Sequence, residues 1–282
     1  MATCANPIAP VEIVTEADLP SGLDGGQSLS SPPPSDLRCG DDEDFLDAED
    51  DASTSSTVPM DMEKGHHSSG DVDDKSPEGF PPESTIFIFD WDDTLMPSTW
   101  LTQKSLRLDN DCVVSEDLQV HLDSMAECAK RTLELAASMG TVVIITNAEQ
   151  GWIELSCRKF MPSLYDSVTQ YRILSARSTF EPEGFQSPFE WKAKAFDREI
   201  GKFYSERSSV CRRNVISFGD SAHEREAILH VTSGMPNCRT KSLKFVERPE
   251  IAQLQKEHEL IAGCLSQIVH HDAALDLCIK CS

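Results

Sequence analysis

Three nearly continuous apolar runs constrain the fold of this chain more than any other feature of its sequence. They read TIFIF from Thr85, TVVII from Thr141 and NVISF from Asn214, and they are rich in β-branched and aromatic residues. A strand with one face in water alternates apolar and polar residues, whereas a strand buried on both faces is apolar throughout. The runs therefore predict interior strands of a parallel sheet that is covered by helices on both faces.

Helical segments separate the expected strands. The clearest spans residues 115–140, where apolar side chains recur at steps of three and four, with Ser115 as the expected cap and Gly140 at the end. A last amphipathic helix is expected from Pro249 to His271. Strands that alternate with helices form parallel sheets with right-handed connections. We therefore expect a three-layer α/β/α, Rossmann-like fold around a parallel five-stranded sheet, with strands at 85–90, 141–146, 172–175, 214–219 and 242–246.

Composition changes abruptly near residue 83. Residues 1–83 contain 20 acidic and 3 basic residues, and they hold most of the negative charge behind the chain's formal net charge of -23. The segment is rich in Ser, Pro, Gly and Asp, and it cannot bury enough apolar surface to offset the entropy of ordering it. We expect a disordered acidic region over 1–83, acting as a docking segment or a spacer, and one folded domain over 84–282.

The acidity and the lack of long apolar runs argue against several classes of function. Nucleic-acid binding through a basic groove and adhesion to an anionic membrane are both disfavoured. No apolar run reaches the about 20 residues of a membrane span, and the N-terminal sequence lacks the features of a secretory signal. We therefore expect a cytoplasmic or nuclear protein that is not secreted, with its cysteines as reduced thiols. The pair Cys278 and Cys281 alone is weak evidence for zinc.

Polar residues follow directly where each apolar run ends, at 90–94, 146–147 and 219–221. In an open parallel sheet, ligands bind at the carboxyl ends of the strands. Several carboxylates in one crevice require a cation, and hard oxygen ligands favour Mg²⁺. A magnesium ion that is held by few carboxylates usually shares a phosphate, so the pattern indicates phosphoryl chemistry.

Four motifs in chain order resemble those of the haloacid dehalogenase-like (HAD) superfamily of hydrolases. They are Asp90-x-Asp92-x-Thr94 after a strand, Thr146 at a strand end, Lys192 near a helix start and Gly219-Asp220-x-x-x-Glu224 after a further strand. The resemblance covers roughly residues 84 to 246, which is most of the expected folded domain. It implies the aspartate-nucleophile phosphatase type of this superfamily, without a large cap domain.

The resemblance also implies a role for each matching residue. Asp90 would be the nucleophile that forms an aspartyl phosphate, and Asp92 would be the general acid and base. Thr146 and Lys192 would bind the phosphoryl group. Mg²⁺ would be held by the carboxylates of Asp90 and Asp220 and by the backbone carbonyl of Asp92. The protein would then be a magnesium-dependent phosphohydrolase.

Three further residues are expected to support the site, namely Asn147, Ser221 and Glu224. Asn147 is expected to cap a helix that starts there, with Gln150 three residues later as in a capping box. Glu224 either bonds the Ser221 backbone in a capping box or contacts the metal, and the sequence leaves both alternatives open.

Side-chain direction decides two assignments among neighbouring residues. Lys192 is preferred to Lys194 because it shares a helix face with Phe189 and Phe196 and should point inward. Asp93 is expected to be a loop residue or an outer group rather than a ligand, because successive side chains at a strand end diverge.

The lack of room for a cap domain is the evidence on substrate size. Neither residues 96–114 nor residues 147–191 are long enough for an independent cap domain. An open site is typical of enzymes that act on a bulky phosphate ester, so the expected substrate is a phosphoprotein or another bulky phosphate ester, with no nucleic acid and no membrane partner. The loop STFEPEGFQSP leaves a pocket for a small molecule as an alternative. The alternative is a catalytically weak or inactive regulatory or scaffold protein of the same fold that binds partners through its acidic region.

Overall fold

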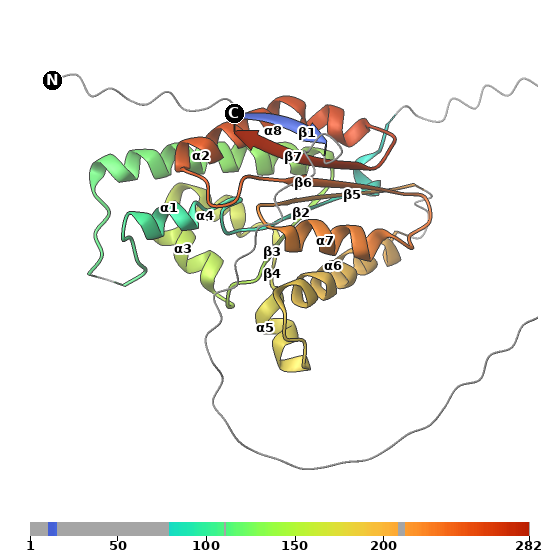
Figure 1. Ribbon diagram of the computed structural model, residues 1–282, viewed down its shortest axis with the longest axis horizontal. Coiled ribbons are helices and arrows are strands. Elements are labelled where there is room, and N and C mark those ends of the chain that lie inside the picture. The colour runs from blue at the N-terminus through green and yellow to red at the C-terminus, as the bar shows by residue number, and fades with distance from the viewer. Residues whose placement is uncertain (1–10, 16–78, 110, 208–211, 282) are drawn as a thin grey trace, which may run out of the picture. The chain divides into compact units, whose positions relative to one another are not determined.

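The computed structural model describes residues 11–15, 79–109, 111–207 and 212–281, all of which belong to one structural unit. Its centre is a seven-stranded sheet in the order β1-β7-β6-β5-β2-β3-β4 (Figure 1). Neighbouring strands from β4 across to β7 pair in parallel, and β1 pairs antiparallel with β7. The strands are β1 (Val11–Thr15), β2 (Thr85–Phe89), β3 (Thr141–Thr146), β4 (Arg172–Ser175), β5 (Arg213–Gly219), β6 (Cys238–Lys244) and β7 (Leu275–Cys281).

The strand order reverses beside β2. The chain runs from β2 outward through β3 to β4, and it then returns to β5 on the other side of β2 and continues through β6 to β7. This is the strand order of Rossmann-type doubly wound folds, in which ligands bind beyond the carboxyl ends of the two strands at the reversal. By this rule, the expected binding region lies beyond Phe89 at the end of β2 and Gly219 at the end of β5.

Helices cover both faces of the sheet, so the α/β fold has three layers (Figure 1). Side chains of β2 alternate between two cores, with Phe87 and Phe89 in one and Ile86 and Ile88 in the other. The helices α2 (Glu116–Met139) and α8 (Ile251–His270) pack on the first core, and α6 (Pro188–Ser205) and α7 (Ala222–Thr232) pack on the second. Four shorter helices complete the unit: α1 (Ser98–Gln103), α3 (Trp152–Phe160), α4 (Tyr165–Val168) and α5 (Ala176–Phe180).

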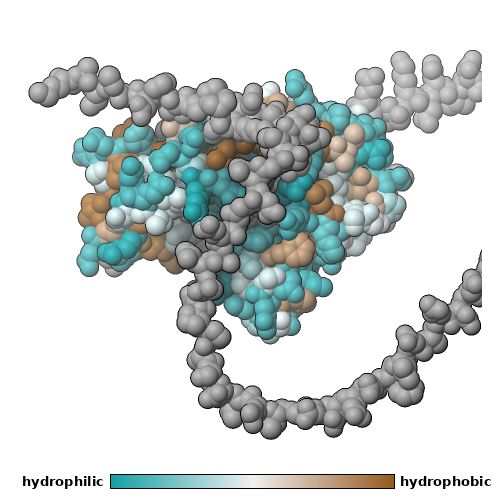
Figure 2. All heavy atoms as spheres, in the orientation of Figure 1, coloured by the Kyte–Doolittle hydropathy of each residue, from teal (hydrophilic) through white to brown (hydrophobic). Residues whose placement is uncertain are grey.

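The apolar runs are buried as expected. All five residues of β2 are buried, as are five of the six residues of β3. On the molecular face drawn in Figure 2, hydrophobic residues lie in scattered patches among hydrophilic ones. No helix in the described part of the chain combines the length and the apolar character that a membrane span requires.

The predicted count of five strands was wrong, because the sheet has seven. β7 lies beyond the last helix and adds a parallel strand next to β6, while β1 closes that edge. β1 also falls inside the region that was predicted to be disordered, so that prediction fails for Val11–Thr15. Most of the remaining region, residues 1–10 and 16–78, lies outside the described residues. The structure describes residues 79–83, and a 3-10 helix begins there at Pro82.

Three predicted helix ends differ in detail from those of the structure. Ser115 is the N-cap residue of α2, but its side chain makes no capping hydrogen bond. Gly140 follows α2 with an extended φ of 176°, so it does not supply a left-handed turn. A Cβ atom at Gly140 would lie 2.5 Å from the carbonyl oxygen of Thr85, so close packing against β2 requires the glycine. The last helix begins at Ile251, with Glu250 rather than Pro249 at its start.

Candidate active site

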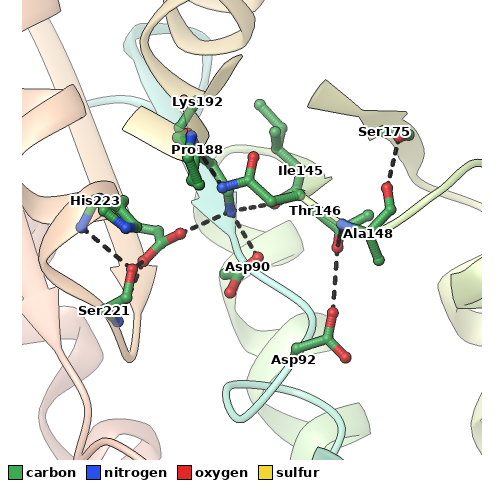
Figure 3. Close-up of polar contacts among 12 residues, drawn as sticks. Asp90, Asp92, Ile145, Thr146, Ala148, Ser175, Pro188, Lys192, Ser221 and His223 are labelled. Atoms are coloured by element: carbon green, nitrogen blue, oxygen red, sulfur yellow. Dashed lines mark hydrogen bonds and ion pairs between the residues drawn. The ribbon is translucent and has the colours of Figure 1, made fainter. Parts of the chain in front are cut away.

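Asp90 and Lys192 are in direct contact at the carboxyl ends of β2 and β3. Asp90 directly follows β2, and its backbone N–H donates to the carbonyl oxygen of Phe218 at 2.9 Å. The Nζ atom of Lys192 donates to Oδ1 of Asp90 at 2.6 Å and to the carbonyl oxygen of Ile145 at 2.7 Å (Figure 3). Both side chains are buried, and Lys192 is only 1% exposed. A lysine from α6 therefore links the ends of two adjacent strands.

The local structure of α6 explains why this lysine points inward. Ser187 and Glu190 form a capping box that fixes the start of the helix. From that start, Lys192 falls on the buried face, whereas Lys194 is exposed and lies with its Nζ atom 4.9 Å from the ring centre of Phe185. The choice of Lys192 over Lys194 by periodicity agrees with this geometry.

Asp220 and Glu224 approach Asp90 from β5 and α7. One carboxylate oxygen from each of the three residues lies within 4.8 Å of the others. Gly219 makes this approach possible, because a Cβ atom there would lie 2.5 Å from Cγ of Glu224. Within the described residues, no hydrogen-bond donor reaches the carboxylate of Asp220. The group therefore contains one carboxylate that is free to bind a cation.

Glu224 has two partners at once. Its Oε2 atom accepts hydrogen bonds from the backbone N–H of Ser221 at 3.1 Å and from the Ser221 hydroxyl, which completes a capping box at the start of α7. Its Oε1 atom lies 3.0 Å from Nζ of Lys192. Burial raises the pKa of Glu224, but Lys192 and Ser221 outweigh that effect and hold the pKa below its usual value. Glu224 thus caps its helix and also contributes charge to the site.

The three carboxylates have too little positive charge around them. Burial raises the pKa of Asp90 to about 7, although Lys192 opposes the shift. Burial also raises the pKa of Asp220 to about 8, and the charges of Asp90 and Glu224 add to it. Burial alone would lower the pKa of Lys192, but Asp90 and Glu224 raise it, so the lysine stays charged. A further cation beside these carboxylates would favour full ionisation of the group at neutral pH.

Asp92 lies apart from this group and is surrounded by hydrogen-bond donors. Its Oδ1 atom accepts from the Ser98 hydroxyl at 2.5 Å and from Nε1 of Trp152 at 2.8 Å. Its Oδ2 atom accepts from the Thr146 hydroxyl at 3.3 Å. Burial raises the pKa of Asp92, and these hydrogen bonds oppose the rise. The sequence indicated neither Ser98 nor Trp152 as a partner of this carboxylate.

The carboxylate of Asp93 contacts Thr99 near the start of α1. Asp93 has a φ of +52°, and its carboxylate accepts from the backbone N–H of Thr99 at 2.8 Å and from the Thr99 hydroxyl at 2.5 Å. The side chain therefore fixes the loop to the start of α1, which agrees with the loop role expected for it.

Thr146 and Asn147 end β3 in different ways. The Thr146 hydroxyl accepts from the backbone N–H of Ala148 at 2.9 Å and is buried beside Asp92. The predicted capping role of Asn147 was wrong, because α3 begins at Trp152, with Gly151 before it at a φ of +90°. The chain makes this left-handed turn before the helix starts, so Asn147 lies too early to cap it. Instead, Nδ2 of Asn147 donates to the carbonyl oxygen of Pro188 at 3.1 Å.

The connections around the site are short. Between β2 and α2 the described chain contains α1 and loops, and between β3 and α6 it contains α3, α4, β4 and α5. These elements pack on the two cores of the sheet, and none of them forms a separate domain in the described part. Neither a protein-family model, a curated protein nor a solved structure matches this chain.

Proposed function

We propose that this chain is a magnesium-dependent phosphohydrolase of the HAD-like, aspartate-nucleophile type. The observation that carries the proposal is the buried Asp90 carboxylate, which lies beyond the strand reversal with Nζ of Lys192 at 2.6 Å. Asp220 and Glu224 complete a group of carboxylate oxygens within 4.8 Å of one another. A nucleophile, a cation-binding group and a phosphate-neutralising lysine in one crevice support phosphoryl transfer.

The donor set fits a hard divalent cation. Carboxylate oxygens are the ligands that Mg²⁺ prefers, and Asp220 accepts no hydrogen bond from the described residues. Asp90 and Asp220 would hold the ion, whereas both oxygens of Glu224 are already occupied by Lys192 and Ser221. When bound, the ion would supply positive charge to the carboxylates and to the phosphoryl group of the substrate.

The chain's own residues would carry two displacement steps. In the first, an oxygen of Asp90 attacks phosphorus, the bond from phosphorus to the ester oxygen breaks, and Asp92 gives its proton to that leaving oxygen. In the second, Asp92 takes a proton from water, the water oxygen attacks phosphorus, and inorganic phosphate leaves Asp90. Lys192 would hold Oδ1 of Asp90 throughout, and the Thr146 hydroxyl would donate to a phosphoryl oxygen.

The surroundings of the site support a bulky substrate. The short connections leave no separate domain over the crevice in the described part of the chain. A phosphate on a protein side chain would reach such a site more easily than it would reach an enclosed one. The net charge of -23 is unfavourable for a nucleic-acid substrate. We therefore propose a phosphoprotein, or another bulky phosphate monoester, as the substrate class.

The test is hydrolysis of p-nitrophenyl phosphate with Mg²⁺ and with excess EDTA. We expect turnover only with Mg²⁺, and we expect Asp90→Asn to reduce it by roughly three orders of magnitude or more. Asp93→Asn is the matched control, because it makes the same change from carboxylate to amide in the same loop. Asp93 does not belong to the group of Asp90, Asp220 and Glu224. If the wild type hydrolyses no phosphate ester, or if Asp90→Asn keeps full activity, the proposal fails.

Beryllium fluoride separates catalysis from phosphate sensing. It forms an analogue of the aspartyl phosphate, so with Mg²⁺ it should raise the melting temperature of the wild type and leave that of Asp90→Asn unchanged. A wild type that binds beryllium fluoride but hydrolyses nothing would be a regulatory protein rather than a phosphatase.

A further inference from the structure

The two oxygens of Asp92 are held very differently. Oδ1 accepts two short hydrogen bonds, from the Ser98 hydroxyl at 2.5 Å and from Nε1 of Trp152 at 2.8 Å. The donors belong to two helices, since Ser98 opens α1 and Trp152 opens α3. Two donors on one oxygen fix both the position and the rotation of the carboxylate.

The second oxygen is held only weakly. Oδ2 accepts from the Thr146 hydroxyl at 3.3 Å, beyond the usual range for a hydroxyl donor. The same hydroxyl accepts a better bond, at 2.9 Å, from the backbone N–H of Ala148. If Thr146 donates to a phosphoryl oxygen, as proposed above, Oδ2 loses this contact and Oδ1 keeps both of its own.

Anchoring of the loop does not depend on Asp92. The carboxylate of Asp93 already ties the loop to α1 through Thr99. Nε1 of Trp91 already ties it to α3 through the Ser156 hydroxyl at 3.1 Å. The loop therefore has a contact with each helix besides those of Asp92, and the specific effect of the Asp92 contacts is on the direction of its carboxylate.

We infer that Trp152 and Ser98 are positioning residues for proton transfer, which hold Asp92 by Oδ1 and leave Oδ2 to exchange a proton with the ester oxygen and then with water. This inference rests on the proposed function. It predicts that loss of a donor lowers kcat/KM more for a substrate whose leaving group needs a proton. A nitrophenolate leaves unprotonated, whereas an alkoxide does not.

The test compares kcat/KM for p-nitrophenyl phosphate and for an alkyl ester, phosphoserine, in the wild type and in Trp152→Phe. The variant keeps an aromatic ring but loses the ring N–H together with part of the indole. We expect kcat/KM to fall about thirtyfold or more for phosphoserine and by less than about threefold for the nitrophenyl ester. Trp191→Phe is the matched control, because it removes a 2.7 Å ring N–H bond to the carbonyl oxygen of Phe185 instead. It should leave the ratio of the two substrates unchanged.

Ser98→Ala keeps the inference testable if Trp152→Phe does not fold. It removes the other donor to Oδ1 and should shift the substrate ratio in the same direction, whereas Ser98→Thr restores a hydroxyl and should return the ratio towards that of the wild type. Equal losses for both esters in Ser98→Ala or Trp152→Phe would overturn the inference and leave the proposed function intact. A wild type that hydrolyses neither ester would remove the proposed function, and the inference with it.

Discussion

Replacement of Lys192 by methionine tests whether this lysine holds the carboxylate group together. The methionine fills a similar volume, but it removes the charge that lies 2.6 Å from Asp90 and 3.0 Å from Glu224. It also leaves the carbonyl oxygen of Ile145 without its donor at 2.7 Å. All the groups involved are buried, so water cannot replace the missing partner without local opening.

The expected loss of stability follows from this burial. Breaking a buried ion pair by removing one partner typically costs about 3–5 kcal/mol, because the remaining charge stays uncompensated. For a folded unit of this size, each kcal/mol lowers the melting temperature by about 2–4 °C, so we expect a drop of about 6–20 °C. Lys194→Met is the matched control, because that side chain is exposed and should change the free energy of unfolding by less than about 1 kcal/mol.

Thermal unfolding measured with and without Mg²⁺ provides the assay. Without the lysine, the group loses the positive charge 2.6 Å from Asp90, and Mg²⁺ is left to supply it, so Mg²⁺ should raise the melting temperature of Lys192→Met at least as much as that of the wild type. Hydrolysis should nevertheless be lost, because the phosphoryl group loses its countercharge. A melting temperature for Lys192→Met within about 2 °C of the wild type would refute the reasoning.

Three further predictions concern single residues. Burial raises the pKa of Glu257 to about 8 from 4.5, so the folded state keeps a proton that the unfolded state releases, and stability falls as pH rises through this window. Glu257→Gln should remove this decline. Its free energy of unfolding relative to the wild type, measured with urea, should be about 3 kcal/mol higher at pH 7.5 than at pH 5, and a pH-independent difference would contradict the assignment. Gly219→Ala places a methyl group 2.5 Å from Cγ of Glu224, so it should lower both stability, by about 1–3 kcal/mol, and kcat/KM, and a fully active variant would show that the strand end can relax. Asp220→Asn should raise the Mg²⁺ concentration needed for half-maximal hydrolysis by roughly tenfold or more, and an unchanged Mg²⁺ titration would exclude it as a ligand.

The core of the fold could be predicted because burial on both faces leaves a direct mark on sequence. The runs that became β2, β3 and β5 have few polar residues, and β2 pairs with β3 on one side and with β5 on the other. The carboxyl ends of parallel strands share one edge, so Asp90, Thr146 and Asp220 could be assigned to one crevice without knowledge of the strand order.

The strands that the sequence analysis missed, β7 and β1, have a weaker sequence pattern. β7 reads LDLCIKC, a short and partly alternating run. It forms a strand because it pairs with the edge of β6. β1 is a five-residue run in acidic surroundings, and its partner lies at the other end of the chain. Strands of this kind are specified by pairing rather than by local propensity, and a sequence read in short windows does not contain the partner.

The contact between Trp152 and Asp92 could not be predicted for a related reason. It joins side chains 60 residues apart through one hydrogen bond. Periodicity assigns Trp152 to a helix start, but the direction of its ring N–H depends on the turn at Gly151, which was read as part of the helix. The only signal was a tryptophan at the first helical turn after a strand that ends in the crevice.

The position of β1 changes how the acidic residues should be regarded. β1 and β2 belong to the same sheet, so the chain that leaves it after Thr15 returns to it at Thr85. The acidic residues between them therefore connect two strands of one sheet, so residues 1–83 are not attached to the folded unit at one end only. β1 is therefore held to the rest of the sheet both by this covalent connection and by its pairing with β7. A single proteolytic cut would turn β1 into a separate peptide that is held to the sheet by five residue pairs with β7.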